Sequence, residues 1–283
     1  TSRVLASRPL AVTPPAQGPG GLEVFPSSGT TGGFALGPDS AVEIILDASG
    51  SMLQRQDGQR RIDIAKAVLT DLATEVIPAG TGFAFRVFGH REAGSCRTDL
   101  EIPLSPLDPA QARAVLGGIE ATNLAKTPIA RSLELVPEDL AGVEGERLVI
   151  LLTDGEETCG GDPAAAVETL ASSGTAARVN IVGFAIDDAD LKSRFRYWAE
   201  LGGGSYFDST NADELGQALV SALSVPYAVF DSGGLEVAQG QVGGDAVTLP
   251  PGEYTVRAAT VPPTEKAVTV KSGETARLTL EQP

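Results

Sequence analysis

The sequence predicts an α/β protein: a doubly wound domain with a mostly parallel sheet, followed by a small all-β domain of the sandwich type. Between residues 41 and 225, short apolar runs alternate with segments in which apolar residues recur at helical spacing. The run 148–152 is almost wholly apolar, as expected of a central parallel strand buried on both faces. After Pro226 the helical period vanishes, and short alternating segments separated by Gly, Pro and Asp predict strands only.

Composition divides the 283 residues into three segments. Residues 1–40 are rich in Pro and Gly, which predicts an N-terminal extension that serves as a tether or lies over the surface. Within it, 22–25 alternates like one short strand, for which the sequence identifies no pairing partner. We assign residues 41–225 to the α/β domain and 226–283 to the small β domain. So short a segment has a small core, so we expect it to pack on the larger domain.

The α/β domain is predicted element by element. Apolar runs predict strands at 42–46, 83–88, 100–104, 148–152, 179–186 and 205–207. Helical spacing predicts helices over 62–76, 190–201 and 215–223. Further helices are expected to begin at Asp108-Pro109, Thr127-Pro128 and Asp162-Pro163, because each pair places a capping side chain before a proline. The Thr127 hydroxyl is therefore expected at a helix N-terminus.

The small β domain is predicted from six alternating segments. They are 228–230, 235–238, 246–249, 254–258, 267–270 and 276–280. Turn residues such as 231–234, 243–245 and 250–252 separate them. This pattern is typical of a sandwich.

Oxygen-bearing side chains follow the first predicted strand of the α/β domain. Asp47, Ser49 and Ser51 fall at alternate positions directly after the apolar run 42–46. A loop that folds back on itself can direct all three oxygens to one place, at the edge of an α/β sheet where ligand sites collect. Mg²⁺ prefers oxygen ligands in octahedral geometry, so this loop predicts a divalent-cation site.

The pattern Asp47-x-Ser49-x-Ser51 after an apolar strand resembles the metal-ion-dependent adhesion site of von Willebrand factor A (vWA) domains. The two further parts of that family's site follow in order: Thr127 on a second loop and Asp154 after a later strand. The resemblance covers about residues 41–224 and implies a Rossmann-like vWA fold. It also implies that the three hydroxyls ligate the ion, and that the two aspartates hold it directly or through water.

The same resemblance implies a function. In the family, an Asp or Glu of a partner protein completes the coordination of the ion, so we expect metal-bridged protein binding. Mg²⁺ is the expected ion, with Mn²⁺ and Ca²⁺ as alternatives. Three other interpretations stay open: a degenerate site without metal, a pilus, envelope or surface-layer component whose metal is mainly structural, and an accessory subunit of a metal-dependent enzyme complex.

Enzymatic activity is not expected, because the sequence lacks a motif that each familiar class of hydrolase or nucleotidase requires. No Gly-x-Ser-x-Gly elbow and no phosphate-binding Gly-x-x-x-x-Gly-Lys loop occurs, and His90 is the single histidine. We interpret His90 as ordering its loop through a hydrogen bond rather than as a base or ligand. Glu156 and Glu157 are interpreted as a solvated acidic loop rather than as extra ligands.

The two cysteines, Cys96 and Cys159, lie in polar, Gly-rich loops rather than in apolar runs. Because Cys159 follows Asp154 closely, both loops are expected near the metal, and we favour a disulfide over two buried thiols. A disulfide implies an oxidising compartment. The flanking sequences resemble an exported bacterial branch of the family, so we expect a secreted, periplasmic or cell-surface protein.

Charge and hydropathy limit the partners. The net charge of −16 argues against nucleic acid and anionic membranes. No apolar run reaches the roughly 18 residues of a transmembrane helix. The partner that the vWA resemblance implies is a protein that presents Asp or Glu.

Overall fold

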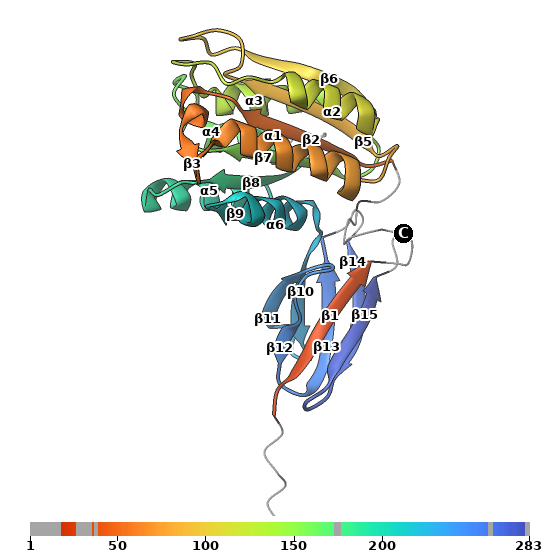
Figure 1. Ribbon diagram of the computed structural model, residues 1–283. Helices are drawn as coiled ribbons and strands as arrows, with labels where there is room; N and C mark the ends of the chain where they lie inside the picture. Colours follow the sequence, from red (N-terminus) through yellow and green to blue (C-terminus); the bar gives the residue numbers. More distant parts are fainter. Residues whose placement is uncertain (1–17, 27–35, 37–38, 173–176, 260–262, 281–283) are drawn as a thin grey trace, which may run out of the picture.

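A six-stranded sheet in the order β6-β5-β2-β7-β8-β9 forms the centre of the α/β domain (Figure 1). Five strands are parallel: β2 (Ala41–Asp47), β5 (Gly82–Phe88), β7 (Arg147–Thr153), β8 (Arg178–Phe184) and β9 (Tyr206–Ser209). The antiparallel edge strand is β6 (Thr98–Pro106). This computed structural model describes residues 18–26, 36, 39–172, 177–259 and 263–280. The predicted mostly parallel sheet is confirmed.

Helices cover both faces of this sheet. One face carries α1 (Arg61–Asp71), which continues as the π-helical turn η3 (Leu72–Val76), together with α2 (Pro109–Gly118) and α6 (Ala212–Leu223). The other face carries α3 (Ile129–Asp139), α4 (Pro163–Ser172) and α5 (Ala189–Leu201). Along β2, Ile44 and Leu46 pack into the first core and Ile45 into the second, because successive side chains of a strand point to opposite faces. The predicted doubly wound arrangement is therefore confirmed.

Two small sheets form the β-sandwich drawn beside the α/β domain in Figure 1. One contains β11 (Glu236–Gln241), β10 (Pro226–Asp231), β13 (Gly252–Ala258) and β14 (Thr264–Val270), in that order. The other contains β12 (Val247–Leu249), β1 (Gly20–Pro26) and β15 (Thr275–Leu280). The six strands expected after Pro226 are all present.

Strand β1 comes from the segment that composition assigns to the N-terminal extension. It runs parallel to β15 and antiparallel to β12, and its Leu22 and Val24 are buried in the sandwich core. The short strand expected at 22–25 is thus confirmed, and its pairing partners are the C-terminal strands. The remaining extension, residues 1–17 and most of 27–38, lies outside the described residues.

Strand register brings the predicted site residues to one edge of the sheet. Leu46 lies beside Leu152, so Asp47 at the end of β2 faces Thr153 and Asp154 at the end of β7. The sandwich leaves from the opposite edge. There the Ser224 carbonyl after α6 accepts a hydrogen bond at 3.0 Å from Arg178, the first residue of β8.

Two short elements between β2 and α1 were not predicted. A 3-10 turn, η2 (Gly50–Leu53), is followed by a tight hairpin of β3 (Arg55–Gln56) and β4 (Gln59–Arg60). Asp57 and Gly58 connect the two strands with φ of 52° and 85°, the conformation for which Asp-Gly hairpin turns are favoured. Among the described helices, none combines the length and apolarity needed to span a membrane.

Candidate metal centre

Asp47 is completely buried at the end of β2, and both of its carboxylate oxygens accept hydrogen bonds. Its Oδ1 accepts from the Ser49 backbone N–H at 2.7 Å, and its Oδ2 accepts from the Thr153 hydroxyl at 2.6 Å. The first bond folds the loop back on itself, as the alternation of Asp47 and Ser49 predicts. The carboxylate is therefore held in one orientation before any ligand arrives.

Ser51 connects this loop to the end of β7. Its hydroxyl donates to Asp154 Oδ1 at 2.6 Å and lies 3.1 Å from the Ser49 hydroxyl. Ser49 and Asp154 are buried. Hydrogen bonds thus connect four of the five predicted ligand residues.

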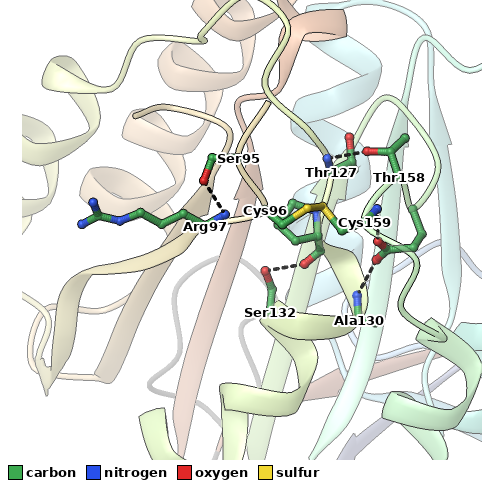
Figure 2. Close-up of a disulfide and its surroundings, with 10 residues drawn as sticks. Ser95, Cys96, Arg97, Thr127, Ala130, Ser132, Thr158 and Cys159 are labelled. Atoms are coloured by element: carbon green, nitrogen blue, oxygen red, sulfur yellow. Dashed lines mark hydrogen bonds between the residues drawn. A yellow bond between two sulfur atoms is a disulfide. The ribbon is translucent and has the colours of Figure 1, made fainter. Parts of the chain in front are cut away.

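Thr127, the fifth predicted residue, lies on the adjoining loop. The Ala125 carbonyl accepts from the Gly50 N–H at 3.4 Å, which places this loop beside the one that carries Ser49 and Ser51. Thr127 is buried, and within the described chain no hydrogen bond joins its hydroxyl to the other four residues. The backbone N–H of Thr127 donates to the Thr158 hydroxyl at 2.8 Å (Figure 2).

The expected capping role of Thr127 is wrong. Pro128 occupies the N-cap position of α3, and no side chain of that residue or of Thr127 caps the helix. The Glu157 carboxylate satisfies the helix instead: its Oε2 accepts from the Ala130 N–H at 2.9 Å. The Thr127 hydroxyl is consequently not engaged by the backbone of α3.

Two buried carboxyls stand close together in this group. Burial, together with the neighbouring charge of Asp154, raises the pKa of Asp47 to about 7. Burial also raises the pKa of Asp154, against hydrogen bonds from Ser51 and Arg61 that lower it. Arg61 Nη1 donates to Asp154 Oδ2 at 2.9 Å and is itself mostly buried.

These residues fit a hard divalent cation. The donors are all oxygens, from carboxylates and hydroxyls, which suits Mg²⁺ or Mn²⁺ better than a softer metal. Arg61 supplies one positive charge against two buried carboxylates, so a further cation would favour the ionised forms of both. Sequence reasoning missed Arg61 because its approach to Asp154 depends on the hairpin β3–β4, which directs the start of α1 towards β7.

The predicted disulfide is present: Cys96 and Cys159 are bonded, with their Cα atoms 5.8 Å apart (Figure 2). Glu157 organises the second of these loops, since its Oε1 accepts from the Cys159 N–H at 2.6 Å. The interpretation of Glu157 as part of a solvated acidic loop is therefore wrong. Glu156 is exposed, as expected, and forms a surface ion pair with Arg194 at 2.9 Å.

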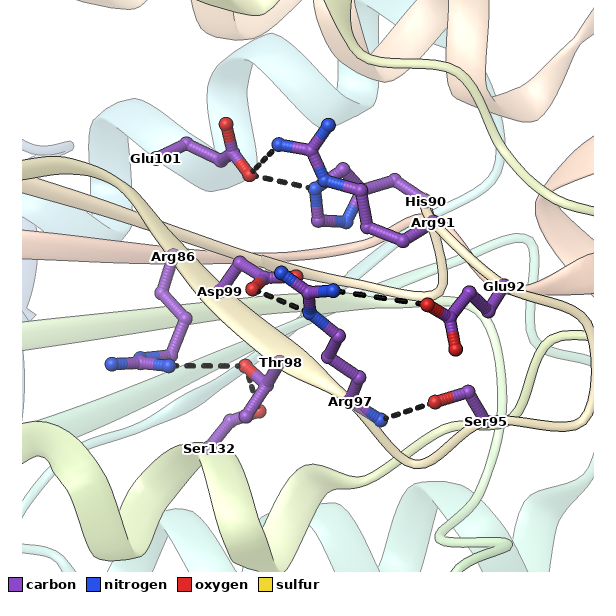
Figure 3. Close-up of polar contacts among 10 residues, drawn as sticks. All are labelled: Arg86, His90, Arg91, Glu92, Ser95, Arg97, Thr98, Asp99, Glu101 and Ser132. Atoms are coloured by element: carbon purple, nitrogen blue, oxygen red, sulfur yellow. Dashed lines mark hydrogen bonds and ion pairs between the residues drawn. The ribbon is translucent and has the colours of Figure 1, made fainter.

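His90 follows β5 at the same edge of the sheet. Its Nε2 lies 2.8 Å from Glu101 Oε1 on β6, which confirms the predicted hydrogen bond of this loop (Figure 3). Arg91 reaches the same Glu101 oxygen at 2.5 Å. The loop after β5 is thus fastened to the edge strand.

Leu124 lies beside the loop that carries the candidate metal ligands Ser49 and Ser51. Its Cα and N lie against Gly50, between the two serines, and its carbonyl accepts from the Gly94 N–H at 2.9 Å. It has a φ of 63°, and 73% of the residue is exposed to solvent. A leucine in the left-handed region costs roughly 1–2 kcal/mol, and such strain is most frequent at functional sites.

Comparison of the sequence with known proteins finds a relative but no matching family model. No sequence-family model matches the chain. YwmD, an uncharacterized protein of Bacillus subtilis, is 38% identical over 190 residues, which cover 64% of this chain and 83% of YwmD. A relative at this identity over most of its length shares the fold of the matched region.

Three solved structures illustrate the fold that this chain shares with known proteins. An aerotolerance-related membrane protein of Bacteroides fragilis is 23% identical with a TM-score of 0.51, covering 65% of this chain and 98% of its own. A von Willebrand factor type A protein of Catenulispora acidiphila is 14% identical with a TM-score of 0.53, covering 93% and 76%. Proximal thread matrix protein 1 of the mussel byssus, solved with a zinc-occupied adhesion-site motif, is 18% identical with a TM-score of 0.53, covering 65% and 44%.

Proposed function

Because the chain belongs to the von Willebrand factor A domain proteins, we propose that it is a binding protein whose metal site captures an acidic side chain of a partner protein. The proposed ligands are the oxygens of Asp47, Ser49, Ser51, Thr127 and Asp154. The proposed ion is Mg²⁺, which would supply an open coordination position for the partner's carboxylate.

The observation that carries the proposal is the group of buried oxygens around Asp47 and Asp154. The Asp47 carboxylate accepts hydrogen bonds from Ser49 and Thr153. The Asp154 carboxylate accepts hydrogen bonds from Ser51 and Arg61. Such preorganisation lowers the cost of binding, because the side chains are ordered before the ligand arrives. A polar group of this size serving only as a loop support would not need two buried carboxylates.

Charge explains why the partner should be acidic. When both aspartates are ionised, which a bound cation would favour, they carry −2 and Arg61 carries +1, so the protein groups alone sum to −1. A divalent cation changes this sum to +1. The occupied site would therefore attract a carboxylate, and the empty site would repel one.

Leu124 would add an apolar contact beside the proposed metal. Leu124 is largely exposed next to Gly50, so a partner residue adjacent to the acidic side chain would lie against it. We propose that the recognised segment combines Asp or Glu with an apolar neighbour. Binding rather than catalysis is proposed, because the site offers ligands and a contact surface.

The disulfide supports the proposed location. Disulfides form and persist outside the reducing cytoplasm, so the Cys96–Cys159 bond favours a secreted, periplasmic or cell-surface protein. It also disfavours the accessory-subunit interpretation, because such subunits function in the cytoplasm. A surface-assembly component whose metal is mainly structural is the alternative that the experiment must separate.

Replacement of Asp47 by Ala tests the proposal. Neutral hydroxyls compete poorly with water for Mg²⁺, so the variant should lose Mg²⁺ binding in calorimetry and lose partner recovery in a pull-down, while circular dichroism stays unchanged. Asp187→Ala is the matched control, because Asp187 follows β8 at the same edge but is exposed. It should behave like the wild type.

Each other outcome contradicts part of the proposal. If the wild type binds no divalent ion at millimolar concentration, the metal site is refuted. If the Asp47 variant unfolds, the metal supports the structure and the assembly interpretation is favoured. If the partner is recovered despite chelator and despite the substitution, it binds another surface.

A further inference from the structure

A second group of metal-ligand side chains lies at the edge of the sheet: His90, Asp99 and Glu101 (Figure 3). Each offers one ligand atom, and these atoms all lie within 4.8 Å of one another. Asp99 and Glu101 are two positions apart on β6, and Glu101 lies at an irregularity in the pairing of β6 with β5. His90 follows the neighbouring antiparallel strand β5, which brings the imidazole alongside them.

Two atoms of this group are buried without a hydrogen-bond partner. They are His90 Nδ1 and Asp99 Oδ2, and the His90 side chain is only 3% exposed. A buried polar atom without a partner costs roughly 1–3 kcal/mol, so its presence calls for an explanation. A bound cation would satisfy the carboxylate oxygen and would use the imidazole as a neutral donor.

Two arginines balance the charge of the group. Arg97 Nε contacts Asp99 Oδ1 at 2.7 Å, and Arg91 contacts Glu101 Oε1. Both arginine side chains are about half exposed, and exposed ion pairs contribute only about 0–1 kcal/mol. Arg97 leaves the second oxygen of Asp99 uncommitted, so a metal would displace weak contacts at little cost.

We propose that His90, Asp99 and Glu101 bind a transition-metal ion of the Zn²⁺ class, at a site separate from the Mg²⁺ site. One imidazole nitrogen with two carboxylates is a donor set suited to Zn²⁺, Co²⁺ or Ni²⁺, whereas Mg²⁺ prefers oxygens alone. The donor chemistry of the two sites therefore selects different ions.

Backbone contacts join the two sites. Gly89, directly before His90, has a φ of 78°, and a Cβ at this position would lie 2.5 Å from the Ser49 nitrogen. The segment that carries His90 is thus pressed against the loop that carries Ser49. An ion held by His90 would fix this segment beside the adhesion-type site without sharing a ligand with it.

The single histidine of the chain makes the direct test specific. Zn²⁺ is titrated into the metal-free protein, with uniform ¹⁵N labelling, and the imidazole nitrogens are followed by NMR. One equivalent of Zn²⁺ should shift one ring nitrogen strongly, and Mg²⁺ in large excess should not. Because this measurement uses the unaltered chain, it does not depend on any variant folding. A His90 signal that ignores Zn²⁺ overturns the proposal.

Variants then identify the other ligands and separate the two sites. Asp99→Asn and Glu101→Gln should each weaken Zn²⁺ binding at least tenfold, whereas the control Glu92→Gln, at an exposed acid of the same loop, should not. Equal affinity in all three variants would show that His90 binds zinc without these carboxylates. The His90 shift should persist in Asp47→Ala; its loss there would place the zinc in the first site and refute a second one.

Discussion

Arg61 and Asp154 form a buried ion pair, with 2.9 Å between Nη1 and Oδ2, at the point where α1 begins beside the end of β7. Among the described residues, Asp154 makes no other ion pair, and Asp47 makes no ion pair with a basic side chain. The guanidinium and the proposed Mg²⁺ therefore stabilise the same carboxylate. Arg61 orders Asp154 in the absence of metal, and its charge would oppose a bound cation.

Replacement of Arg61 by Gln should tighten Mg²⁺ binding. Two charges a few ångströms apart interact by about 4 kcal/mol at an effective dielectric constant near 20, and loss of part of this repulsion predicts roughly tenfold tighter binding. The same change should destabilise the metal-free protein, since Asp154 loses its counter-charge. Calorimetry with Mg²⁺ and urea denaturation in chelator measure the two effects.

Arg60→Gln is the matched control for that experiment. Arg60 is adjacent in sequence but pairs with Asp63 and Glu120 at the surface, so its loss should leave Mg²⁺ affinity unchanged. Weaker Mg²⁺ binding in Arg61→Gln would show that ordering of Asp154 outweighs repulsion, contrary to the prediction.

Removal of the disulfide should lower stability more than it lowers metal affinity. The double variant Cys96→Ser, Cys159→Ser should lose about 2–4 kcal/mol of unfolding free energy, because the unfolded chain is no longer constrained. Both loops keep hydrogen bonds that do not depend on the disulfide. The Gly94 N–H donates to the Leu124 carbonyl, and the backbone N–H of residue 159 donates to the Glu157 carboxylate. Urea denaturation of oxidised, reduced and variant protein checks this, and equal midpoints for all three would contradict it.

Part of the site could be predicted from sequence because its residues follow strands. Asp47 and Asp154 stand directly after apolar runs, and parallel strands bring their ends together, so their proximity follows from the fold class. Arg61 and Glu157 could not be predicted, because they act through contacts that depend on loop geometry. Glu157 caps α3 from a different loop, in place of the expected Thr127.

The pairing of β1 illustrates the same limit for the fold. Alternation at 22–25 predicts a strand, but the parallel register of Leu22 with Ala276 joins segments at opposite ends of the sequence. Pattern describes which face of a strand is apolar and carries no information about its neighbour. The division near residue 225 remains a prediction, which limited proteolysis would test.

Glu43 should make the stability of the protein depend on pH. It is completely buried in β2 with Arg86 and Asp139, and neither of its oxygens has a hydrogen-bond partner. Burial raises its pKa well above 4.5, and the charge of Asp139 raises it further. The folded protein therefore keeps a proton that the unfolded chain releases, so stability should fall as pH rises above about 4.5.

Glu43→Gln removes this proton linkage without changing the shape of the side chain. The variant should match the wild type near pH 4 and exceed it at pH 8, in urea denaturation performed with chelator at both pH values. A wild type and a variant whose stabilities change in parallel over this range would show that Glu43 does not titrate differently on folding.

We expect Leu124 to contribute to partner binding while its backbone conformation lowers the stability of the folded protein. Its left-handed backbone costs roughly 1–2 kcal/mol, which glycine avoids, although glycine also gives the unfolded chain about 0.4–1 kcal/mol of additional entropy. Leu124→Gly should therefore raise the unfolding free energy by about 0.5–1 kcal/mol. The same variant should recover less partner in a Mg²⁺-dependent pull-down, because the apolar contact beside Gly50 is lost.

Leu235→Gly provides the comparison, since Leu235 is also an exposed leucine, lies in the sandwich and has no positive φ. That change should lower stability slightly through the unfolded state and leave partner recovery unchanged. Mg²⁺ affinity should be the same in both variants, because neither residue offers a ligand oxygen. If Leu124→Gly gains stability and still recovers the partner fully, the partner contacts the metal alone, and the strained leucine has no part in recognition.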